Sequence, residues 1–281
     1  MSDHSHDVAV GIRRLFDRDA TSYYEAKYSG ADPRQAYSFA ARLALVAEML
    51  GPHPGGVLDV GCGPGVMIEP VVARGGRLTG IDLSAEMVGR ARDRARALRA
   101  EGRCRFIVGS AEGLPFEDAA FDAVTAMGVL EYVPDDARAL REMARVVRPG
   151  GAVIVTVPNL VSPWRLLPVL AKPPCLRFLR PAYRAARRRV APAEGCELDR
   201  FPRRLYTSWG LDGRLADAGL RKADGVFYNF RLPVLGTVCP RGSVRVAAAL
   251  APLGRSGVAG WVGGGYVAKA GKVWSGFPAR R

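Results

Sequence analysis

The sequence predicts an α/β fold, in which a doubly wound, seven-stranded and mostly parallel sheet carries helices on both faces. Short apolar runs alternate with helical segments from residue 57 onward, and this alternation is typical of parallel sheets covered by helices. A glycine-rich turn follows the first apolar run directly, at the place where such sheets bind ligands. The 281 residues suffice for one such domain with an added segment.

The first part of the chain supplies five predicted strands and the helices between them. The strands are predicted at 57–60, 77–81, 104–108, 121–126 and 152–157. The helices are predicted at 39–50, 66–74, 84–100 and 135–147. Ser84 is the expected N-cap of the third helix. The run Pro149-Gly150-Gly151 is expected to end the fourth.

The last part of the chain completes the sheet. A helix is predicted at 207–219, with Thr207 or Ser208 as its cap, and a sixth strand at 225–230. A helix at 244–250 and a seventh strand at 265–269 follow. The expected divisions are an N-terminal helical arm (1–38), the core (39–158), a basic helical cap insertion (159–205), the C-terminal part of the core (206–270) and a tail (271–281).

Composition restricts the compartment and the partners. The formal net charge of +14 indicates either an anionic partner or simply a surface rich in solvated arginine. Five cysteines without a CxxC pair match neither a disulfide framework nor a zinc site, so we expect a cytoplasmic protein. The polar N-terminus lacks the pattern of a secretory signal, and no run of 18 uncharged apolar residues is present.

The predicted insertion is strongly basic. Residues 160–210 hold eleven Lys or Arg and three Asp or Glu. The resulting charge of 11 − 3 = +8 is more than half of the formal net charge of the chain, +14. In 164–190 apolar residues and arginines alternate in clusters. Such a segment suits the surface of an anionic membrane, giving a peripheral membrane contact, or a lipid-like acidic acceptor. It also suits RNA, or a cap helix with its arginines in water.

The strongest motif is the run VLDVGCGPG at 57–65, a buried strand that enters a turn with glycines at 61, 63 and 65. Glycines permit a tight turn and close approach of a ligand to the backbone. Asp82 follows the second strand, 17 residues after Gly65, where an acid accepts hydrogen bonds from ribose hydroxyls. Val66 replaces the third glycine of a dinucleotide motif, which favours a methionine moiety over a pyrophosphate.

Five segments resemble class I S-adenosylmethionine-dependent methyltransferases, in the broad group of the ubiquinone and menaquinone enzymes. The resemblance covers about residues 55–158 and is looser at 204–211 and 218–220. It implies a Rossmann-like sheet and S-adenosyl-L-methionine as cofactor. The matching segments are VLDVGCGPG (57–65), GIDLS (80–84), GSAEGLPFED (109–118), FDAVTAMGVLEYVPD (121–135) and RVVRPGGAVIVTVPN (145–159).

The resemblance also implies the cofactor contacts. The turn glycines would line the methionine and ribose parts, and Asp59 would orient the turn. Asp82 would bind the ribose diol, Leu83 would contact the adenine, and Met127 would lie near the sulfonium. The complete expected set is Asp59, Gly61, Cys62, Gly63, Gly65, Asp82, Leu83, Met87, Ser110, Ala111, Glu112 and Met127. The family usually has Asp where this chain has Ser110, so a weaker acceptor would meet the adenine amino group.

Methyl transfer makes modest demands on the protein. The reaction is an in-line displacement, so alignment of the two reactants supplies much of the rate. A general base is needed only when the acceptor loses a proton. The candidates are Glu131, Tyr132, Tyr28 and Tyr206. The favoured interpretation of Glu131 is a simple helix-start acid rather than a base, and neither a catalytic histidine nor a metal site is expected.

We therefore predict an S-adenosylmethionine-dependent methyltransferase (EC 2.1.1.-) that acts on a small apolar or anionic biosynthetic intermediate, with O-methylation preferred. One alternative is an RNA or protein methyltransferase that uses the basic insertion. Another is a non-catalytic partner protein that binds the cofactor. The segment after the fourth strand reads MGVL at 127–130. It lacks the Asn/Asp-Pro-Pro-Tyr run and the Pro-Cys nucleophile of nucleic-acid base methyltransferases, so nucleic acid is not the expected partner.

Overall fold

The computed structural model places most of the predicted core. It describes residues 33–162, 204–230 and 239–273, together with Val10, Gly11, Arg14, Phe16 and Asp17 of the predicted arm. The predictions made for segment 164–190 and for Tyr28 lie outside these residues. Among the helices described, none is long and apolar enough to cross a membrane.

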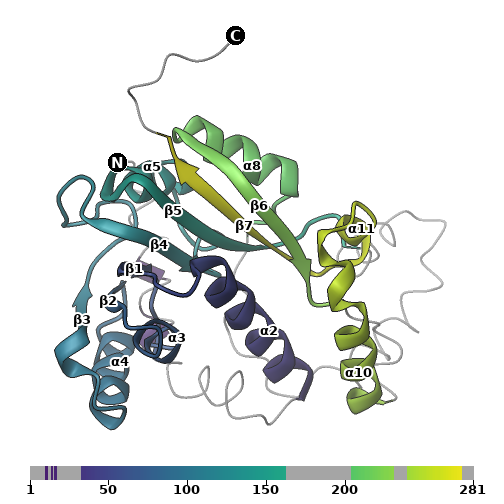
Figure 1. Cartoon of the computed structure of the whole chain (residues 1–281), viewed down its shortest axis with the longest axis horizontal. Helices are drawn as coiled ribbons and strands as arrows, with labels where there is room; N and C mark the ends of the chain where they lie inside the picture. The colour runs from purple at the N-terminus through teal and green to yellow at the C-terminus, as the bar shows by residue number, and fades with distance from the viewer. Residues whose placement is uncertain are drawn as a thin grey trace.

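Seven strands form one sheet, as predicted (Figure 1). The strand order is β3-β2-β1-β4-β5-β7-β6. The first five strands are parallel, and β7 pairs antiparallel with both β5 and β6. The chain moves outward from β1 in one direction and then returns to β4 on the other side, so β1 and β4 flank a topological switch point. The strands are β1 Gly56–Val60, β2 Arg77–Asp82, β3 Cys104–Val108, β4 Phe121–Met127, β5 Val147–Pro158, β6 Leu220–Tyr228 and β7 Gly265–Lys272.

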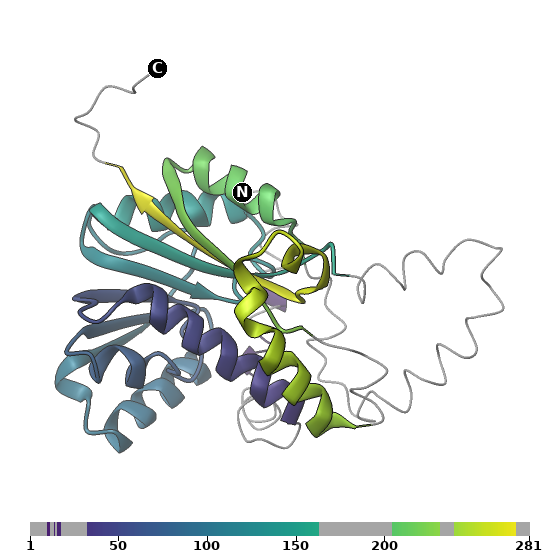
Figure 2. The ribbon, with the colours of Figure 1, turned by 45° about the vertical axis from the view of Figure 1, so that its right-hand side comes forward.

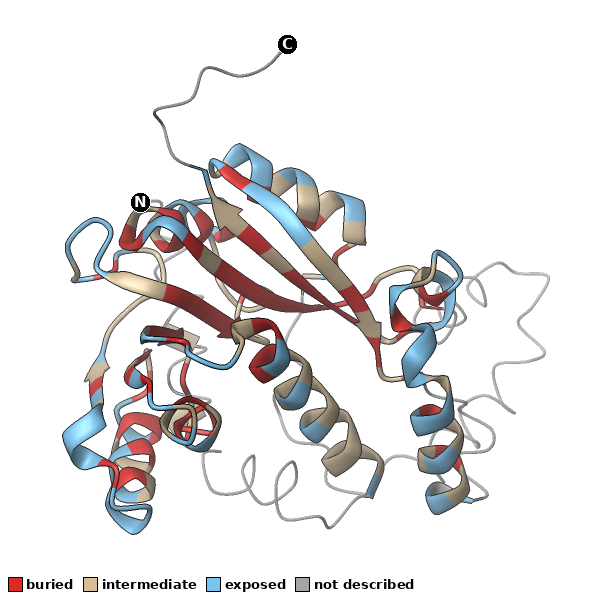
Figure 3. Ribbon diagram, viewed as in Figure 1, coloured by how far each residue is buried: buried red, intermediate tan, exposed pale blue. Residues whose placement is uncertain are grey.

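Helices cover both faces of the sheet, and the two faces bury separate apolar clusters (Figures 2 and 3). On β1, Leu58 and Val60 pack toward α5 and α8, while Val57 packs toward α2, α3 and α4. This alternation follows from the two-residue period of a strand. The helices are α2 Pro33–Leu50, α3 Ile68–Val72, α4 Ala85–Ala97, α5 Asp136–Val146, α8 Ser208–Asp217, α10 Pro240–Leu250 and α11 Ala259–Val262, with 3₁₀ turns η1 Glu101–Arg103 and η4 Ala251–Arg255.

Several boundaries differ from the prediction. Helices α2 and α10 begin several residues earlier than predicted, each at a proline, because proline is favoured in the first turn of a helix. Strand β6 begins at Leu220 rather than at residue 225, because an edge strand tolerates the exposed Arg221 and Lys222. Helix α3 is shorter than predicted, and η4 and α11 were not predicted.

Predicted helix caps agree with the structure. The Ser84 side chain accepts a hydrogen bond from the Met87 amide at 3.2 Å and caps α4. The Thr207 side chain accepts a bond from the Gly210 amide at 3.0 Å and caps α8. Each cap satisfies one of the free amides at a helix start, which fixes where the helix begins.

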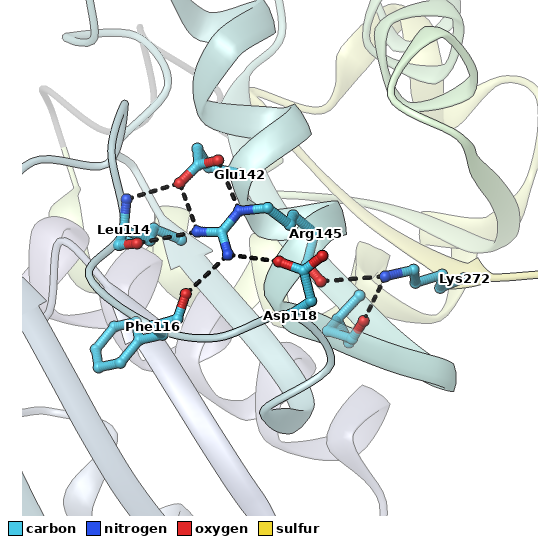
Figure 4. A network of polar contacts seen from close by, with 7 residues as sticks. Leu114, Phe116, Asp118, Glu142, Arg145 and Lys272 are labelled. Atoms are coloured by element: carbon cyan, nitrogen blue, oxygen red, sulfur yellow. Dashed lines mark hydrogen bonds and ion pairs between the residues drawn. The ribbon is translucent and has the colours of Figure 1, made fainter.

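A polar clamp holds the loop after β3 against α5 (Figure 4). Arg145 donates to the carbonyl oxygens of Leu114 and Phe116 at 3.0 and 2.7 Å. It also pairs with Asp118 at 2.8 Å. Glu142 accepts a bond from the Leu114 amide at 2.8 Å, and Arg145 lowers the pKa of the Glu142 carboxyl by hydrogen bonding to it. The clamp therefore orders the loop that begins with the predicted adenine-binding residues.

Candidate functional site

A pocket opens at the carboxyl ends of the parallel strands, beside the switch point between β1 and β4. Its empty volume, including the open mouth, is about 1020 Å³. The lining residues come from the turn after β1, the ends of β2 and β4, the loop after β3, helix α2 and the N-terminal arm. They are Phe16, Arg42, Gly61, Cys62, Gly63, Pro64, Val66, Ile81, Asp82, Leu83, Met87, Gly109, Ser110, Ala111, Glu112, Met127, Gly128, Val129, Tyr132, Val133 and Pro134.

The three turn glycines have different roles. All three adopt positive φ, at +66° for Gly61, +50° for Gly63 and +77° for Gly65, a region that side chains with a Cβ disfavour. A Cβ on Gly63 would meet no atom within 4 Å, so the backbone there faces open pocket space. A Cβ on Gly65 would lie 3.2 Å from Ala91 of α4. Gly65 does not line the pocket, and its role is to let α4 pack closely, which differs from the expected cofactor contact.

Asp82 links the turn to the start of α4. One carboxylate oxygen accepts from the Gly63 amide at 2.8 Å, and the other accepts from the Ser84 amide at 3.0 Å. Burial raises the pKa of this carboxyl, while these two amides oppose the rise. Each carboxylate oxygen can accept a further hydrogen bond. Asp82 lines the pocket, and this geometry suits a pair of ribose hydroxyls.

The residues after β3 form a second polar wall. Ser110 Oγ accepts a hydrogen bond from the Glu112 amide at 3.2 Å. The Glu112 carboxylate accepts one from the Asp135 amide at 2.7 Å. The Ser110 hydroxyl therefore keeps its hydrogen for a bond to a ligand. Leu83 and Met87 also line the pocket and supply apolar surface for a flat ring.

Asp59 lies behind the pocket rather than in its lining. Its side chain is buried, and one oxygen accepts from the Thr125 hydroxyl at 2.7 Å. The other oxygen, Oδ2, has no hydrogen-bond partner among the described residues. Burial raises the pKa of Asp59 to about 7. Asp59 supports the turn from within the sheet, and the structure shows no direct opening toward a ligand at this side chain.

Arg42 of α2 lines the pocket and was not predicted. Its guanidinium lies over the Phe39 ring at 4.5 Å from the centroid. A Cβ on Gly128 would come within 2.7 Å of Arg42 Nη1, so the guanidinium lies against the corner after β4. A helical spacing of four and seven residues places Arg42 on the same side as the buried Val46 and Met49. A cation on the apolar face of a predicted helix is the signal that would have identified it.

The predicted catalytic residues lie in different places. Tyr132 lines the pocket, and its ring contacts Phe16 edge to face with centroids 5.7 Å apart. Glu131 does not line the pocket, although its Oε1 would lie 3.5 Å from a Cβ on Gly128. Its backbone carbonyl accepts from the Arg204 amide at 3.0 Å.

Tyr206 lies in the core and not in the pocket. Its hydroxyl is 2.7 Å from Asp136 Oδ2 and 3.0 Å from the Leu130 carbonyl oxygen. Burial raises the pKa of the Tyr206 hydroxyl well above its usual value. Arg204 and Arg214 also pair with Asp136, at 2.7 and 2.9 Å. The expectation that Tyr206 reaches the site is therefore wrong, because its hydroxyl belongs to a buried network that joins α5 to α8.

The N-terminal arm reaches the site through two described residues. Phe16 lines the pocket. Asp17 accepts a hydrogen bond from the Ser84 hydroxyl at 2.5 Å, and its charge also raises the pKa of Asp82, after the larger effect of burial. Phe16 and Asp17 of the arm thus lie at one side of the pocket, next to the start of α4.

The residues present fit S-adenosyl-L-methionine. Arg42 offers a cation to the carboxylate of the methionine part, and Asp82 offers acceptors to the ribose hydroxyls. The backbone at Gly63 leaves the space in which a Cβ would otherwise project. In the described part of the chain, no group of three or more His, Cys, Asp or Glu side chains is arranged to hold a metal ion.

Comparisons with known proteins agree with this geometry. Residues 58–155 match the family described as a methyltransferase domain. The Ubiquinone biosynthesis O-methyltransferase of Alkalilimnicola ehrlichii is 33% identical over 227 residues, which cover 80% of this chain and 83% of that protein. The protein of the same name from Xanthomonas axonopodis pv. citri is 33% identical over 184 residues, covering 62% and 76%.

Solved structures share the fold. A Thermotoga maritima protein described as a possible histamine N-methyltransferase gives a TM-score of 0.58 at 20% identity, covering 92% of this chain and 99% of that one. The geranyl diphosphate C-methyltransferase of Streptomyces coelicolor, in complex with Mg²⁺, geranyl diphosphate and S-adenosyl-L-homocysteine, gives 0.53 at 19%, covering 84% and 79%. From the pocket, the family match and the relative aligned over most of its length, we conclude that this chain belongs to the class I S-adenosyl-L-methionine-dependent small-molecule methyltransferases.

Proposed function

We propose that the enzyme methylates a hydroxyl group of an apolar small molecule. The observation that carries this proposal is the composition of the pocket wall beyond the corner at Met127. There Val129, Tyr132 and Val133 face the pocket together with Phe16 of the arm. An apolar wall with a single phenol binds an apolar ring and can orient one hydroxyl on it. The relatives named as ubiquinone biosynthesis O-methyltransferases support the same chemistry.

The chain's own residues bind and orient the reactants. Arg42 would hold the carboxylate end of the cofactor, Asp82 would hold the ribose, and Leu83 would cover the adenine. The bound cofactor supplies an electrophilic methyl group on its sulfonium. Phe16 and Tyr132, in edge-to-face contact, shield the acceptor from water. Alignment of the acceptor oxygen with the methyl group then provides most of the acceleration.

Tyr132 is our candidate for guiding the acceptor hydroxyl. It is the one predicted catalytic residue that the described structure places in the pocket lining. A hydrogen bond from the acceptor to the phenol oxygen would orient the hydroxyl toward the methyl group. Methylation would make that oxygen strongly acidic, and its proton would pass to solvent. Glu131, one residue away, would act through the Gly128 corner rather than by touching the acceptor.

For the basic segment 164–190 we propose a contact with anionic lipid or an acidic acceptor, against the alternatives of RNA binding and of arginines exposed to water. Neutralising Arg187, Arg188 and Arg189 is expected to weaken binding to anionic vesicles by about 1 kcal/mol for each arginine. If vesicle binding does not change, these arginines are exposed to solvent and do not contact lipid.

The experiment for the proposed function is an acceptor screen. Purified enzyme and S-adenosyl-L-methionine are incubated with phenols and catechols that carry apolar tails, with matched compounds whose hydroxyl is already methylated, and with tRNA and a protein mixture. We expect release of S-adenosyl-L-homocysteine with the free hydroxyl compounds only. Turnover on RNA or protein, or equal turnover on the blocked compounds, would contradict O-methylation of a small molecule.

A further inference from the structure

Exposed apolar side chains gather on one turn near the end of the chain. Val258, Trp261 and Val262 are 71%, 65% and 41% exposed, and Leu253 of η4 is 53% exposed. Val258 directly precedes α11, and Trp261 and Val262 of α11 lie three and four residues after Val258. Helical spacing therefore places all three side chains on one side. We call Leu253, Val258, Trp261 and Val262 the apolar knuckle. Large apolar side chains gathered on a surface mark an interaction site.

The apolar knuckle is held outward by well-satisfied contacts on its inner side. The buried side chain of Asn159 donates to the carbonyl oxygens of Gly260 and Gly263, both at 2.8 Å. A Cβ on Gly260 would lie 3.3 Å from the Phe227 ring, and one on Gly263 would lie 2.9 Å from the Phe227 side chain. The inner side of α11 is therefore packed against β6, and the exposure of Trp261 is a feature of an anchored element.

The preceding turn is anchored in the same way. Arg255 of η4 pairs with Glu48 of α2 and with Asp224 of β6, each at 3.1 Å. These contacts engage the charge of Arg255 and orient η4, while Leu253 stays exposed. The turn is thus fixed to two core elements.

The apolar knuckle lies at the same edge of the sheet as the pocket. Elements α10, η4 and α11 lie between the end of β6 and the start of β7 in the chain. Tyr228 at the end of β6 and Pro158 at the end of β5 both pair with Gly265 at the start of β7. That edge is the carboxyl edge of the parallel strands, where the pocket opens. Figures 1 and 2 show α10 running beside α2, the helix that brings Arg42 to the pocket.

Within segment 239–264, which carries the apolar knuckle, every charged side chain is an arginine. Residues 239–264 contain three arginines and neither Asp nor Glu. Arg241 and Arg245 of α10 are exposed, while Arg255 is paired. An exposed tryptophan among aliphatic side chains, on a segment that also carries exposed arginines, is a combination that prefers the boundary between lipid headgroups and acyl chains.

We propose that the apolar knuckle inserts into the surface of an anionic lipid bilayer and brings the mouth of the pocket to an acceptor dissolved in that bilayer. Insertion buries the side chains of Val258 and Trp261, and Arg241 and Arg245 bind the anionic headgroups. The inference rests on the proposed apolar acceptor, because only such an acceptor resides in lipid. It assigns the membrane contact to a folded part of the core, independently of segment 164–190.

The test is co-sedimentation of the full chain with vesicles of phosphatidylcholine and phosphatidylglycerol, compared with vesicles of phosphatidylcholine alone. The variant is the double substitution Val258→Ser and Trp261→Ser. The matched control is Trp209→Ser, because Trp209 of α8 is equally exposed, at 66%, but lies in a groove between α8 and α5. Binding of S-adenosyl-L-homocysteine confirms that each protein is folded.

We expect the wild-type protein to bind the anionic vesicles, the double variant to bind about tenfold more weakly, and the control to match the wild type. Brominated lipids are expected to quench tryptophan fluorescence of the wild type and the Trp209→Ser control, and the quenching is expected to fall in Trp261→Phe, which keeps Trp164, Trp209 and Trp274. Equal binding by all proteins, or absence of quenching, would overturn the proposal. If the wild-type protein is a dimer that does not bind vesicles, and the double variant is a monomer, the apolar knuckle contacts a second copy of this chain. That result would overturn the membrane proposal.

The two proposals fail in different ways. Vesicle binding requires neither cofactor nor acceptor, so its absence leaves the acceptor screen unaffected. If the double variant also loses turnover on a water-soluble phenol, the apolar knuckle is needed for the site itself and the membrane role is wrong. We expect turnover on the soluble phenol to stay within about twofold of the wild type, because these side chains lie outside the pocket lining.

Discussion

The Asp82 carboxylate accepts a hydrogen bond from the Gly63 amide at 2.8 Å, joining the end of β2 to the turn after β1. The other carboxylate oxygen binds the Ser84 amide. Asp82 therefore holds two pocket walls together before any ligand enters. The same oxygens have lone pairs left for ribose hydroxyls, so one side chain both shapes the pocket and binds in it.

Replacing Asp82 by alanine is expected to weaken binding of S-adenosyl-L-homocysteine by about 1–3 kcal/mol, because the ribose hydroxyls and the Gly63 amide lose their acceptor. Calorimetric titration measures the change. Asp93→Ala is the control, since Asp93 lies exposed on α4, outside the pocket lining, and pairs with Arg96. Equal affinity in both variants would show that Asp82 does not bind the ribose.

Replacing Ser110 by aspartate is expected to tighten binding of S-adenosyl-L-homocysteine several-fold. The carboxylate keeps the bond from the Glu112 amide and adds an acceptor for the adenine amino group. The gain should vanish with the inosine analogue, in which that amino group is an oxygen. The same gain with both ligands would indicate a general effect on the loop.

Asp59 predicts a specific dependence of stability on pH. Burial raises its pKa to about 7 in the folded protein, against about 3.9 in the unfolded chain. Between these values only the folded state keeps the proton, so the free energy of unfolding falls as pH rises, by up to about 1.4 kcal/mol per pH unit. Above pH 7 the loss is complete.

The Asp59→Asn variant is expected to lack this decline. Urea denaturation between pH 5 and pH 8 gives the free energy of unfolding of both proteins. Their difference should change across the window and become constant above it. Parallel profiles would mean that Asp59 is ionised throughout.

Because Arg145 of α5 holds the loop after β3, we expect this residue to affect cofactor binding although it does not line the pocket. Arg145→Ala is expected to reduce the free energy of unfolding by about 2–3 kcal/mol, because two carbonyl groups and Asp118 lose a charged donor. It should also weaken cofactor binding, since the released loop begins at the Ser110 wall. Arg138→Ala, an exposed arginine on the same helix, is the control. A loss of stability with normal cofactor affinity would restrict the clamp to a folding role.

Two tyrosine variants distinguish a role in catalysis from a role in stability. Tyr132→Phe is expected to lower kcat about tenfold with little effect on stability, because this ring lines the pocket. Tyr206→Phe is expected to lower stability by about 1 kcal/mol and leave kcat unchanged, because its hydroxyl bonds to Asp136. A lower kcat in Tyr206→Phe, with only a loss of stability in Tyr132→Phe, would show that Tyr206 and not Tyr132 acts in the site.

Local patterns predicted much of this fold. The strand before Gly61, the caps at Ser84 and Thr207 and the acid at Asp82 depend on residues close in sequence, and the structure has them where they were expected. Asp82 reaches Gly63 only because β1 and β2 pair in parallel, and that pairing follows from the alternation of strands and helices.

Contacts between segments far apart in the chain could not be predicted from local sequence patterns. Arg42 reaches the pocket because α2 packs on one face of the sheet over β5, β7 and β6, and the neighbours of Arg42 in sequence do not specify that position. Gly65 looks like its two neighbours in the turn, but it packs against Ala91 of α4. Tyr206 follows the basic insertion, where a site residue was expected, yet its hydroxyl meets Asp136, 70 residues earlier.

The most direct test of the account is calorimetric titration of the wild-type protein with S-adenosyl-L-homocysteine and, separately, with NAD. The pocket at Gly63 and Asp82 predicts saturable micromolar binding of S-adenosyl-L-homocysteine and no heat from NAD. Binding of NAD, or of neither compound, would contradict the assignment of this pocket to S-adenosyl-L-methionine.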